Sequence, residues 1–174
     1  MLTGEGADEL FAGYEYMQEI TDEAELHAEL RRTIAGLHNL NLQRADRVTM
    51  AHGLEARVPF LDREMIAHAL ALPAEAKVAG SGRQEKWLLR EAFDGWLPEA
   101  LLWRDKLQFG DGSGAADALT SRLEDDITEE EFESERYAVD PPLRDHSELH
   151  YFRIFAEHLP GIRPERVLGR FATV

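Results

Sequence analysis

Hydrophobic residues recur every three or four positions over several stretches of the chain, which is the spacing of one helix face. The clearest stretches begin near Leu26, Leu42, Met65, Trp87 and Leu149. No stretch alternates hydrophobic and polar residues for long enough to build a sheet of its own. The sequence therefore predicts a mainly α fold.

The expected helix ends follow from capping residues and prolines. Thr21 is the expected cap of the first long helix, and Asp62 is the expected cap of a helix that Pro73 ends. Between these helices, residues 55–61 are predicted to be extended, because Pro59 disfavours the α conformation of the residue before it.

An acidic run, residues 124–135, has two interpretations. A calcium loop would need a glycine and a regular series of oxygen ligands, which this run lacks. Thr128 and Glu131 instead have the spacing of a capping box, and Ile127 and Phe132 are placed as its hydrophobic staple. We therefore expect a helix start rather than a metal site.

The length and composition indicate an ordinary globular protein. A chain of 174 residues suits one domain with a real core. The absence of cysteine excludes disulfides, zinc-thiolate sites and cysteine nucleophiles. No apolar run approaches the roughly 18 residues of a membrane span, and no signal-like segment opens the chain. We expect a soluble, cytoplasmic protein with no membrane partner.

The charge balance is strongly acidic, with 34 acidic residues against 19 basic ones and a formal charge of −15. This balance argues against nucleic acid as a partner, because phosphates require a basic surface. Only three of the basic residues are lysines. An acidic, lysine-poor surface is typical of proteins that work in high salt, so a halophilic source and an ordinary acidic protein from a GC-rich genome both stay open.

The opening residues suggest a binding site. Gly4 and Gly6 bracket Glu5, and Asp8 and Glu9 stand where a helix would begin. Glycines allow a positive φ or a close approach to a ligand, and the carboxylates can meet a helix N-terminus or a divalent cation. A plain strand-to-helix turn is the alternative. A dinucleotide fingerprint is not expected, because Glu9 occupies the place of its third glycine.

Lys106 is a second candidate site residue. It lies between Trp103 and Phe109, just before the glycine-rich segment 110–114. A lysine in this setting can clamp a phosphate or a developing negative charge. The alternative is an ordinary surface lysine.

Four segments together resemble one known family, the C-terminal synthetase domain of glutamine-dependent asparagine synthetases. They are TGEGADELFAGY (3–14), MAHGLEARVPFLD (50–62), EKWLLREAF (85–93) and LPEALLWRDKLQFGDG (97–112). The order and spacing also fit, and the resemblance continues weakly to the helix at 147–159. It implies that residues 1–174 are a partial synthetase domain, the C-terminal helical part of an α/β PP-loop domain of the adenine nucleotide alpha hydrolase-like kind.

The resemblance also implies a reaction. Such enzymes activate the side-chain carboxylate of aspartate with ATP and magnesium, forming β-aspartyl-AMP and pyrophosphate, and ammonia from glutamine then displaces AMP. Glu5 matches the catalytic glutamate, which can take a proton from the attacking amine. Asp8 matches an acid that helps to hold magnesium and pyrophosphate, and Lys106 matches the lysine that stabilises charge on the phosphate.

The remaining matches are less direct. Gly4 and Gly6 flank the catalytic glutamate and are expected to lie near the substrate and nucleotide. Arg57 is expected to be a structural anchor, with a ligand role as the alternative. Thr3 replaces the serine that usually precedes GEG, and Ala12 replaces a glycine common at that position.

Two parts of the family are missing from the sequence: the SGGxDS-type ATP loop and the glutaminase domain with its N-terminal cysteine. We expect these parts in a missing segment or another chain. The isolated chain is then expected to be inactive, and an uncovered apolar face would favour a homo-oligomer. Two other functions stay open: a non-catalytic helical interaction module, and a related amidotransferase acting on another carboxylate. Glu5 favours the asparagine type, since lactam-forming relatives tend to place tyrosine there.

Overall fold

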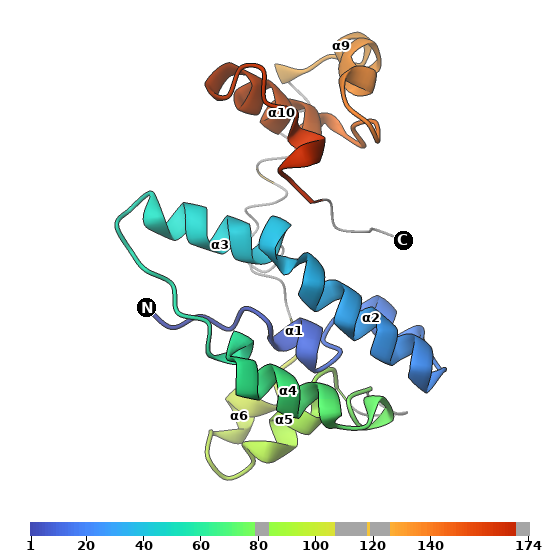
Figure 1. Cartoon of the computed structure of the whole chain (residues 1–174), viewed down its shortest axis with the longest axis vertical. Helices are drawn as coiled ribbons and strands as arrows, with labels where there is room; N and C mark the ends of the chain where they lie inside the picture. Colours follow the sequence, from blue (N-terminus) through green and yellow to red (C-terminus); the bar gives the residue numbers. More distant parts are fainter. Residues whose placement is uncertain (79–83, 107–117, 119–125, 170–174) are drawn as a thin grey trace. The chain divides into compact units, whose positions relative to one another are not determined.

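The computed structural model describes residues 1–78, 84–106, 118 and 126–169. These residues belong to two compact units, one with the described residues up to Lys106 and the other with those from 118 to 169. Both units are built from helices, as the sequence predicts, and the described residues contain no β-strand longer than a single bridge (Figure 1).

The helices of the two units have the following bounds. The first unit contains α1 (Ala7–Leu10), α2 (Glu23–Gly36), α3 (Asn41–Met50), α4 (Arg63–Ala71), α5 (Trp87–Ala92) and α6 (Glu99–Leu102), with 3₁₀ turns at Glu15–Glu19, Leu37–Asn39, Pro59–Leu61 and Ala74–Ala76. The second unit contains α9 (Glu129–Glu135) and α10 (His146–His158), with 3₁₀ turns at Arg136–Ala138 and Pro164–Arg166.

Helix α2 buries the hydrophobic stripe that predicts it. Leu26 and Leu30 are fully buried against Met17 and Ala74. The predicted cap was wrong by one residue, because Asp22 rather than Thr21 accepts the hydrogen bond from the Glu25 amide, at 2.8 Å. Aspartate is at least as good a cap as threonine, and its charge also suits the helix N-terminus.

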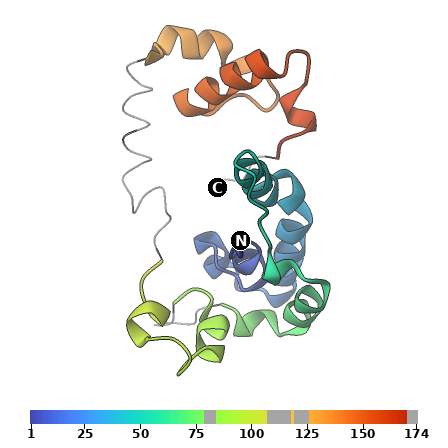
Figure 2. The same cartoon turned by 90° about the vertical axis from the view of Figure 1, so that its left-hand side faces the viewer.

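A second core joins α1 to α4. Leu10, Phe11 and Ala69 are buried together, with Leu89 of α5 packed against them. The short helix α1 contacts both α2 and α4 (Figures 1 and 2). As predicted, Asp62 caps α4, since its Oδ1 accepts the amide of Glu64 at 2.8 Å. Helix α1, which carries Asp8 and Glu9, is thus held in place by its contacts with α2 and α4.

The second unit is a small helical pair. The predicted capping box is present: Thr128 and Glu131 exchange side-chain-to-backbone hydrogen bonds at the start of α9. Both members of the predicted staple, Ile127 and Phe132, are buried in one cluster with Leu149 of α10. The acidic run therefore begins a helix, as expected from its pattern.

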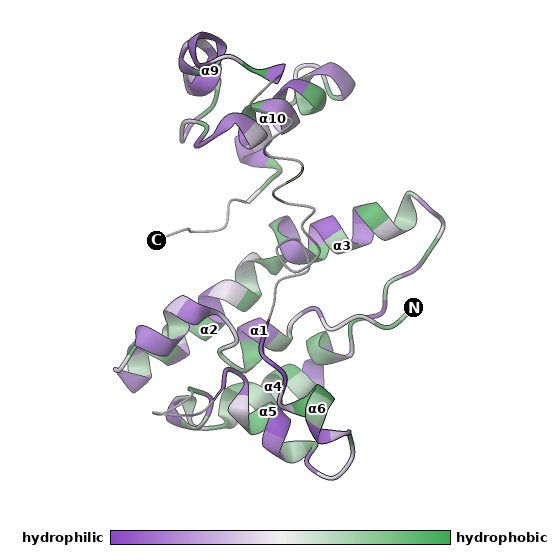
Figure 3. Ribbon diagram, turned by 180° about the vertical axis from the view of Figure 1, so that it is seen from behind, coloured by the Kyte–Doolittle hydropathy of each residue, from purple (hydrophilic) through white to green (hydrophobic). Residues whose placement is uncertain are grey.

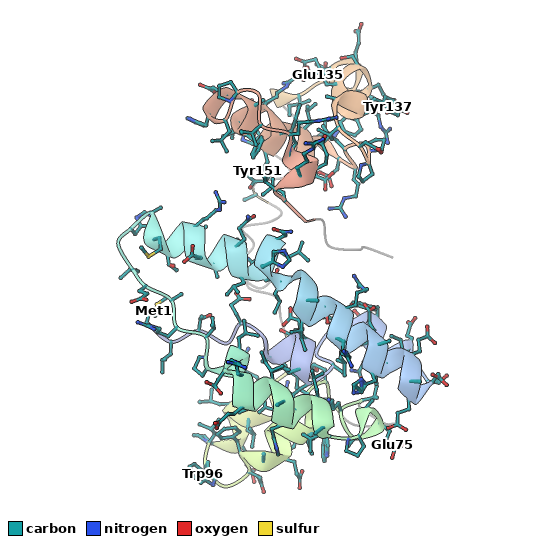
Figure 4. All side chains as sticks on the ribbon, viewed as in Figure 1. Met1, Glu75, Trp96, Glu135, Tyr137 and Tyr151 are labelled. Carbon is teal, nitrogen blue, oxygen red and sulfur yellow. The ribbon has the colours of Figure 1, made fainter. Side chains whose placement is uncertain are left out.

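The surface of the described residues is mixed. Hydrophobic residues gather on α4, α5 and α6, while α9 is strongly hydrophilic (Figure 3). Large side chains that project from the ribbons include Met1 and Trp96 in the first unit and Tyr137 in the second (Figure 4). None of the described helices combines the length and the apolar character needed to cross a lipid bilayer.

Candidate active site

The first residues of the chain lie beside the segment that follows α3. Leu2 and Arg57 form a parallel β-bridge, in which the Thr3 amide donates to the Arg57 carbonyl at 2.9 Å and the Arg57 amide donates to the Met1 carbonyl at 2.7 Å. The expected extended conformation at residues 55–61 is thus present at Arg57, whereas Pro59–Leu61 forms a 3₁₀ turn. This pairing sets the direction in which the chain enters the GEG turn.

The two glycines of the turn have different surroundings. Gly6 has φ +95°, and a Cβ added there would lie 2.5 Å from Leu61 Cδ2. Only glycine therefore allows α1 to begin so close to the Pro59–Leu61 turn. A Cβ on Gly4 would meet nothing within 4 Å. The described surroundings thus give Gly6 a packing role and leave Gly4 facing open space.

Asp8, in the first turn of α1, is the centre of the site. Its Oδ1 accepts hydrogen bonds from Lys106 Nζ at 2.8 Å and from Lys86 Nζ at 3.0 Å. Burial raises the pKa of this carboxyl, but the Lys106 hydrogen bond and the charges of both lysines outweigh it and hold the pKa below its ordinary value of 3.8. Asp8 is therefore a carboxylate at neutral pH, flanked by two ammonium groups.

Lys106 has two further contacts that fix its ammonium group. Its Nζ donates to the Gly13 carbonyl at 2.8 Å and lies 5.3 Å from the centre of the Tyr14 ring. A Cβ on Gly13 would lie 2.0 Å from Asp8 Oδ1, so the absence of a side chain at Gly13 makes room for the carboxylate that both lysines contact. The aromatic pair predicted around Lys106 involved residue 109, which lies outside the described residues.

A partly buried hydrogen-bond cluster of Glu9, Tyr14 and Asn41 lies next to Lys106. The Tyr14 hydroxyl donates to Glu9 Oε1 at 2.5 Å, and Asn41 Nδ2 donates to the Tyr14 hydroxyl at 2.9 Å. Burial raises the pKa of Tyr14, and the Glu9 carboxylate raises it further. The phenol thus stays protonated, and its ring is held in place beneath the Lys106 ammonium group.

Glu5 has a weaker partner. Arg44 Nη2 of α3 approaches Glu5 Oε1 at 3.4 Å, and the arginine side chain is 66 % exposed whereas that of Glu5 is 20 % exposed. An ion pair of this length with an exposed partner constrains a carboxylate little. Glu5 therefore lies in the turn just before the helix that carries Asp8, and its ion pair among the described residues is weak, which suits a group that exchanges protons.

Arg57 acts through its backbone in the described residues. Its amide and carbonyl hold the first residues of the chain, while its guanidinium pairs with Glu55 at 3.0 Å on the surface. The backbone pairing suits a structural anchor, and both roles considered for Arg57 in the sequence stay predictions.

Glu9 was named in the sequence as a carboxylate at the helix start, whereas four other residues of the site were missed: Lys86, Gly13, Tyr14 and Asn41. Lys86 stands 78 residues from Asp8 and Asn41 stands 32 from Glu9, so no local pattern connects them. One signal was present for Lys86, since it is one of only three lysines and lies within a segment that resembles the family.

The donor set suits an anion better than a bare metal ion. Among residues 1–78, 84–106, 118 and 126–169, no three His, Cys, Asp or Glu side chains gather closely enough to hold a metal. Asp8 contributes one negative charge, whereas Lys86 and Lys106 contribute two positive ones. The two ammonium groups beside Asp8 can attract phosphate oxygens, which lysine binds as a point charge.

Comparison with known proteins places this sequence in a family. Residues 18–153 match the Asparagine synthase family. The chain is 36 % identical over 163 residues to Asparagine synthetase B [glutamine-hydrolyzing] of Escherichia coli, covering 92 % of this chain and 29 % of the relative. It is 43 % identical over 137 residues to the asparagine synthetase of Triphysaria versicolor, covering 74 % of this chain and 23 % of the relative.

A third relative, the probable asparagine synthetase of Schizosaccharomyces pombe, is 39 % identical over 171 residues, covering 92 % of this chain and 31 % of the relative. The chain thus spans less than a third of the length of these curated relatives. The matched residues include α2 to α6 and most of α10, so they extend through both compact units. This chain belongs to the asparagine synthase family.

Proposed function

We propose that this chain carries part of the synthetase site of a glutamine-dependent asparagine synthetase. The overall reaction joins ammonia from glutamine to the side-chain carboxylate of aspartate, while ATP becomes AMP and pyrophosphate through β-aspartyl-AMP. The convergence of Lys86 and Lys106 on Asp8, beside the GEG turn, carries this proposal. Membership of a family whose relatives are named for asparagine synthesis supports it.

The two lysines are proposed to bind the phosphates of ATP. Their ammonium groups already share one oxygen in the protein, so a phosphate oxygen could take the place of Asp8 Oδ1 without new groups having to be assembled. Charges arranged in advance stabilise a developing charge most effectively, because no reorganisation is needed during the reaction. Lys106, fixed by Gly13 and Tyr14, is the proposed catalytic member of the pair.

Asp8 is proposed to contact magnesium only together with the phosphates. Proteins commonly hold this ion through one or two carboxylates plus the phosphates of the substrate. One carboxylate at Asp8 fits that pattern once the lysines turn towards phosphate oxygens. When bound, magnesium would neutralise phosphate charge, while the chain's own part is to keep Asp8 ionised through its two lysines.

Glu5 is the proposed general base. Its carboxylate precedes α1, and its ion pair among the described residues is the long contact to Arg44, so it can accept a proton from the amine as the carbon–nitrogen bond forms. The open space beside Gly4 supports a close approach of the substrate to this turn. Gly6 and Arg57 are proposed to shape the site by packing and backbone pairing, although both remain candidates for ligand contact.

The parallel bridge between Leu2 and Arg57 bears on the wider fold. Parallel strands occur almost only in sheets covered by helices on both faces. We therefore propose that these residues join the sheet of an α/β PP-loop synthetase domain, to which the helices described here contribute one part. The ATP loop and the glutaminase domain would then come from other residues of the protein or from another chain.

A chimera tests the proposed function. This chain would replace the matching 163-residue region of the E. coli relative, and aspartate-dependent release of AMP and formation of asparagine would be measured. We expect the chimera to form asparagine. Lys106→Ala and Glu5→Ala should each reduce turnover about a hundredfold with little change in substrate binding, as expected for groups that act in the transition state.

The matched control for these variants is Arg32→Ala, which removes an exposed arginine of α2 that pairs with Glu29 one turn away. Its turnover should equal that of the unchanged chimera. A folded chimera that binds ATP but makes no asparagine would contradict the proposed function. Near-normal turnover of the Lys106→Ala or Glu5→Ala chimera would contradict the role given to that residue.

A further inference from the structure

Arg90 connects the two segments that supply the lysines. This arginine lies in α5, and its side chain is only 12 % exposed. Its Nε donates to the Glu85 carbonyl at 3.0 Å and its Nη2 donates to Glu85 Oε1 at 2.5 Å. Glu85 directly precedes Lys86, so one side of the guanidinium holds the start of the first lysine segment.

The other side of the guanidinium holds the second lysine segment. Arg90 Nη1 donates to the carbonyls of Leu102 and Arg104, the latter at 3.1 Å. Leu102 is the last residue of α6, whose final carbonyls have no partner within the helix. Arg90 therefore closes the end of α6 and fixes the backbone two residues before Lys106.

Two more contacts join the same segments. The rings of Trp87 and Trp103 are 4.9 Å apart, and Gln84 Nε2 donates to Asp105 Oδ1 at 3.1 Å. Arg90 is nevertheless the residue that makes the largest number of these hydrogen bonds, four in all. Residues 84–90 and 102–105 are thus joined by several contacts, including two hydrogen bonds from Arg90.

The backbone at Lys86 supports the same conclusion. Lys86 has φ +55° and ψ +32°, a left-handed conformation that is uncommon for a residue with a side chain. Such a conformation is strained for a residue with a side chain and persists only where neighbouring contacts hold it. Arg90 supplies contacts of this kind on both sides: its side chain binds Glu85, and its amide donates to the Lys86 carbonyl at 3.0 Å.

A lysine at position 90 could not make the same four hydrogen bonds. The guanidinium presents five donors in a planar fork, and four hydrogen bonds in different directions use that geometry here. An ammonium group has three donors around one point and cannot reach both segments together.

We propose that Arg90 is a positioning residue, which holds the Lys86 and Lys106 ammonium groups close enough together to act as one receptor for a polyphosphate. Arg90 itself does not contact Asp8 in the described residues; it acts through the backbone before each lysine. The receptor part of this inference rests on the proposed function, whereas the positioning part rests on the contacts alone.

Lysine-selective NMR tests the positioning part directly. The chain has only three lysines, Lys77, Lys86 and Lys106, so ¹³Cε labelling of lysine gives three signals. Lys86→Arg and Lys106→Arg assign them. In Arg90→Gln we expect both site signals to move towards the position of an unconstrained lysine, while the signal of the buried Lys77 stays in place.

Arg32→Gln is the matched control, because it makes the same replacement at an exposed position of α2. All three lysine signals should stay unchanged there. A purely structural role for Arg90 would move the Lys77 signal as well, since the whole unit would loosen. Unchanged Lys86 and Lys106 signals in a folded Arg90→Gln chain would overturn the proposal.

Calorimetry with inorganic pyrophosphate tests the receptor part. We expect the unchanged chain to bind pyrophosphate, and Arg90→Gln to weaken the affinity about tenfold, because two charge-assisted contacts lose their common geometry. Equal affinity in both chains would overturn the inference and leave the proposed function standing. If the unchanged chain binds no pyrophosphate, the receptor part is overturned, the chimera alone decides the proposed function, and the NMR result alone decides the positioning role.

Arg90→Lys covers the case in which Arg90→Gln does not fold. It keeps the charge and most of the apolar stem, adds one lysine signal of its own, and should still displace both site signals. A chain with Arg90→Lys that lost its helical circular dichroism would overturn the proposal, because Arg90 would then be a structural residue of the whole unit.

Discussion

Lys77 combines complete burial with a charge that has no partner. Its side chain is 0 % exposed, and in the described part of the chain its Nζ has no hydrogen-bond partner. Burial lowers the pKa of this ammonium group, because the charged form loses its hydration. An ammonium group in such a site costs the native state free energy relative to the unfolded chain.

Lys77→Met should therefore stabilise the protein. We expect the free energy of unfolding at pH 7 to rise by roughly 1–3 kcal/mol, since methionine fills a similar volume without a charge. Denaturant unfolding followed by circular dichroism measures the change. Arg31→Met, which removes a charge from an exposed position of α2, is the control and should have little effect. A destabilised Lys77→Met chain would contradict the interpretation of Lys77 as an unpaired charge.

The same residue predicts a pH dependence. The pKa of Lys77 is lower in the folded protein than its ordinary value of 10.5, so between these two values the unfolded chain binds more protons. Stability from this group therefore rises with pH through that window and is complete above 10.5. We expect the advantage of Lys77→Met to shrink in the same window, which unfolding curves from pH 7 to 11 can follow.

Gly13 supports a second prediction at this scale. A Cβ there would lie 2.0 Å from Asp8 Oδ1 and 2.9 Å from the Asp8 Cα, so backbone as well as side chain would have to move. Gly13→Ala should cost about 1–3 kcal/mol and displace Asp8 from its lysines. Thermal unfolding measures the stability change. Gly4→Ala, whose Cβ meets nothing within 4 Å, is the control, and equal melting temperatures for the two variants would refute the argument.

The residues of the site differ in how well the sequence predicts them. Glu5, Asp8 and Lys106 were predicted because they stand in segments that resemble a known family. Lys86 and Arg90 lie in the same segments, yet their roles depend on a left-handed backbone and on contacts between α5 and α6. Such contacts arise only in the folded chain, so no spacing in the sequence predicts them.

At the scale of elements, local signals predicted the helices well. Asp62, the capping box at Thr128 and the helix ending near Pro160 all depend on residues within one turn of each other. The error at Thr21 has the same origin, because Thr21 and Asp22 are both good caps and only the entry of the chain into α2 decides between them. The bridge of Leu2 to Arg57 joins distant residues and was not predicted.

Two alanine variants of α9 compare the stability contributed by its N-cap with that contributed by a residue inside the helix. Thr128→Ala should destabilise the second unit by about 1 kcal/mol, because the Glu131 amide loses its partner at the start of the helix. Ser134→Ala also removes a hydroxyl, but inside α9, where the serine hydroxyl donates to the Glu131 carbonyl. Alanine is the better helix former, so this variant should be neutral or slightly stabilising. Equal losses in denaturant unfolding would contradict the role given to the cap.

At the scale of the whole molecule, the dominant property is the net charge of −15. Most ion pairs among the described residues have at least one exposed side chain, as with Arg57 and Glu55, and exposed pairs contribute about 0–1 kcal/mol each. Salt weakens those pairs but also screens the repulsion among the excess carboxylates. The excess of carboxylates is large and the exposed ion pairs are weak. We therefore expect the screening of repulsion to outweigh the weakening of the pairs, so that salt raises the stability of the folded chain.

The chain should therefore melt at a higher temperature in molar potassium chloride than in dilute buffer. Circular dichroism across a salt series measures this, and most of the gain should come below about 1 M, where the Debye length has already fallen to roughly 3 Å. Near pH 4.8, the isoelectric point, the net charge vanishes and the gain should vanish with it. Sodium sulfate should stabilise at both pH values, since it acts by strengthening burial. A melting temperature that stays flat or falls with potassium chloride at neutral pH would remove the physical support for a halophilic protein.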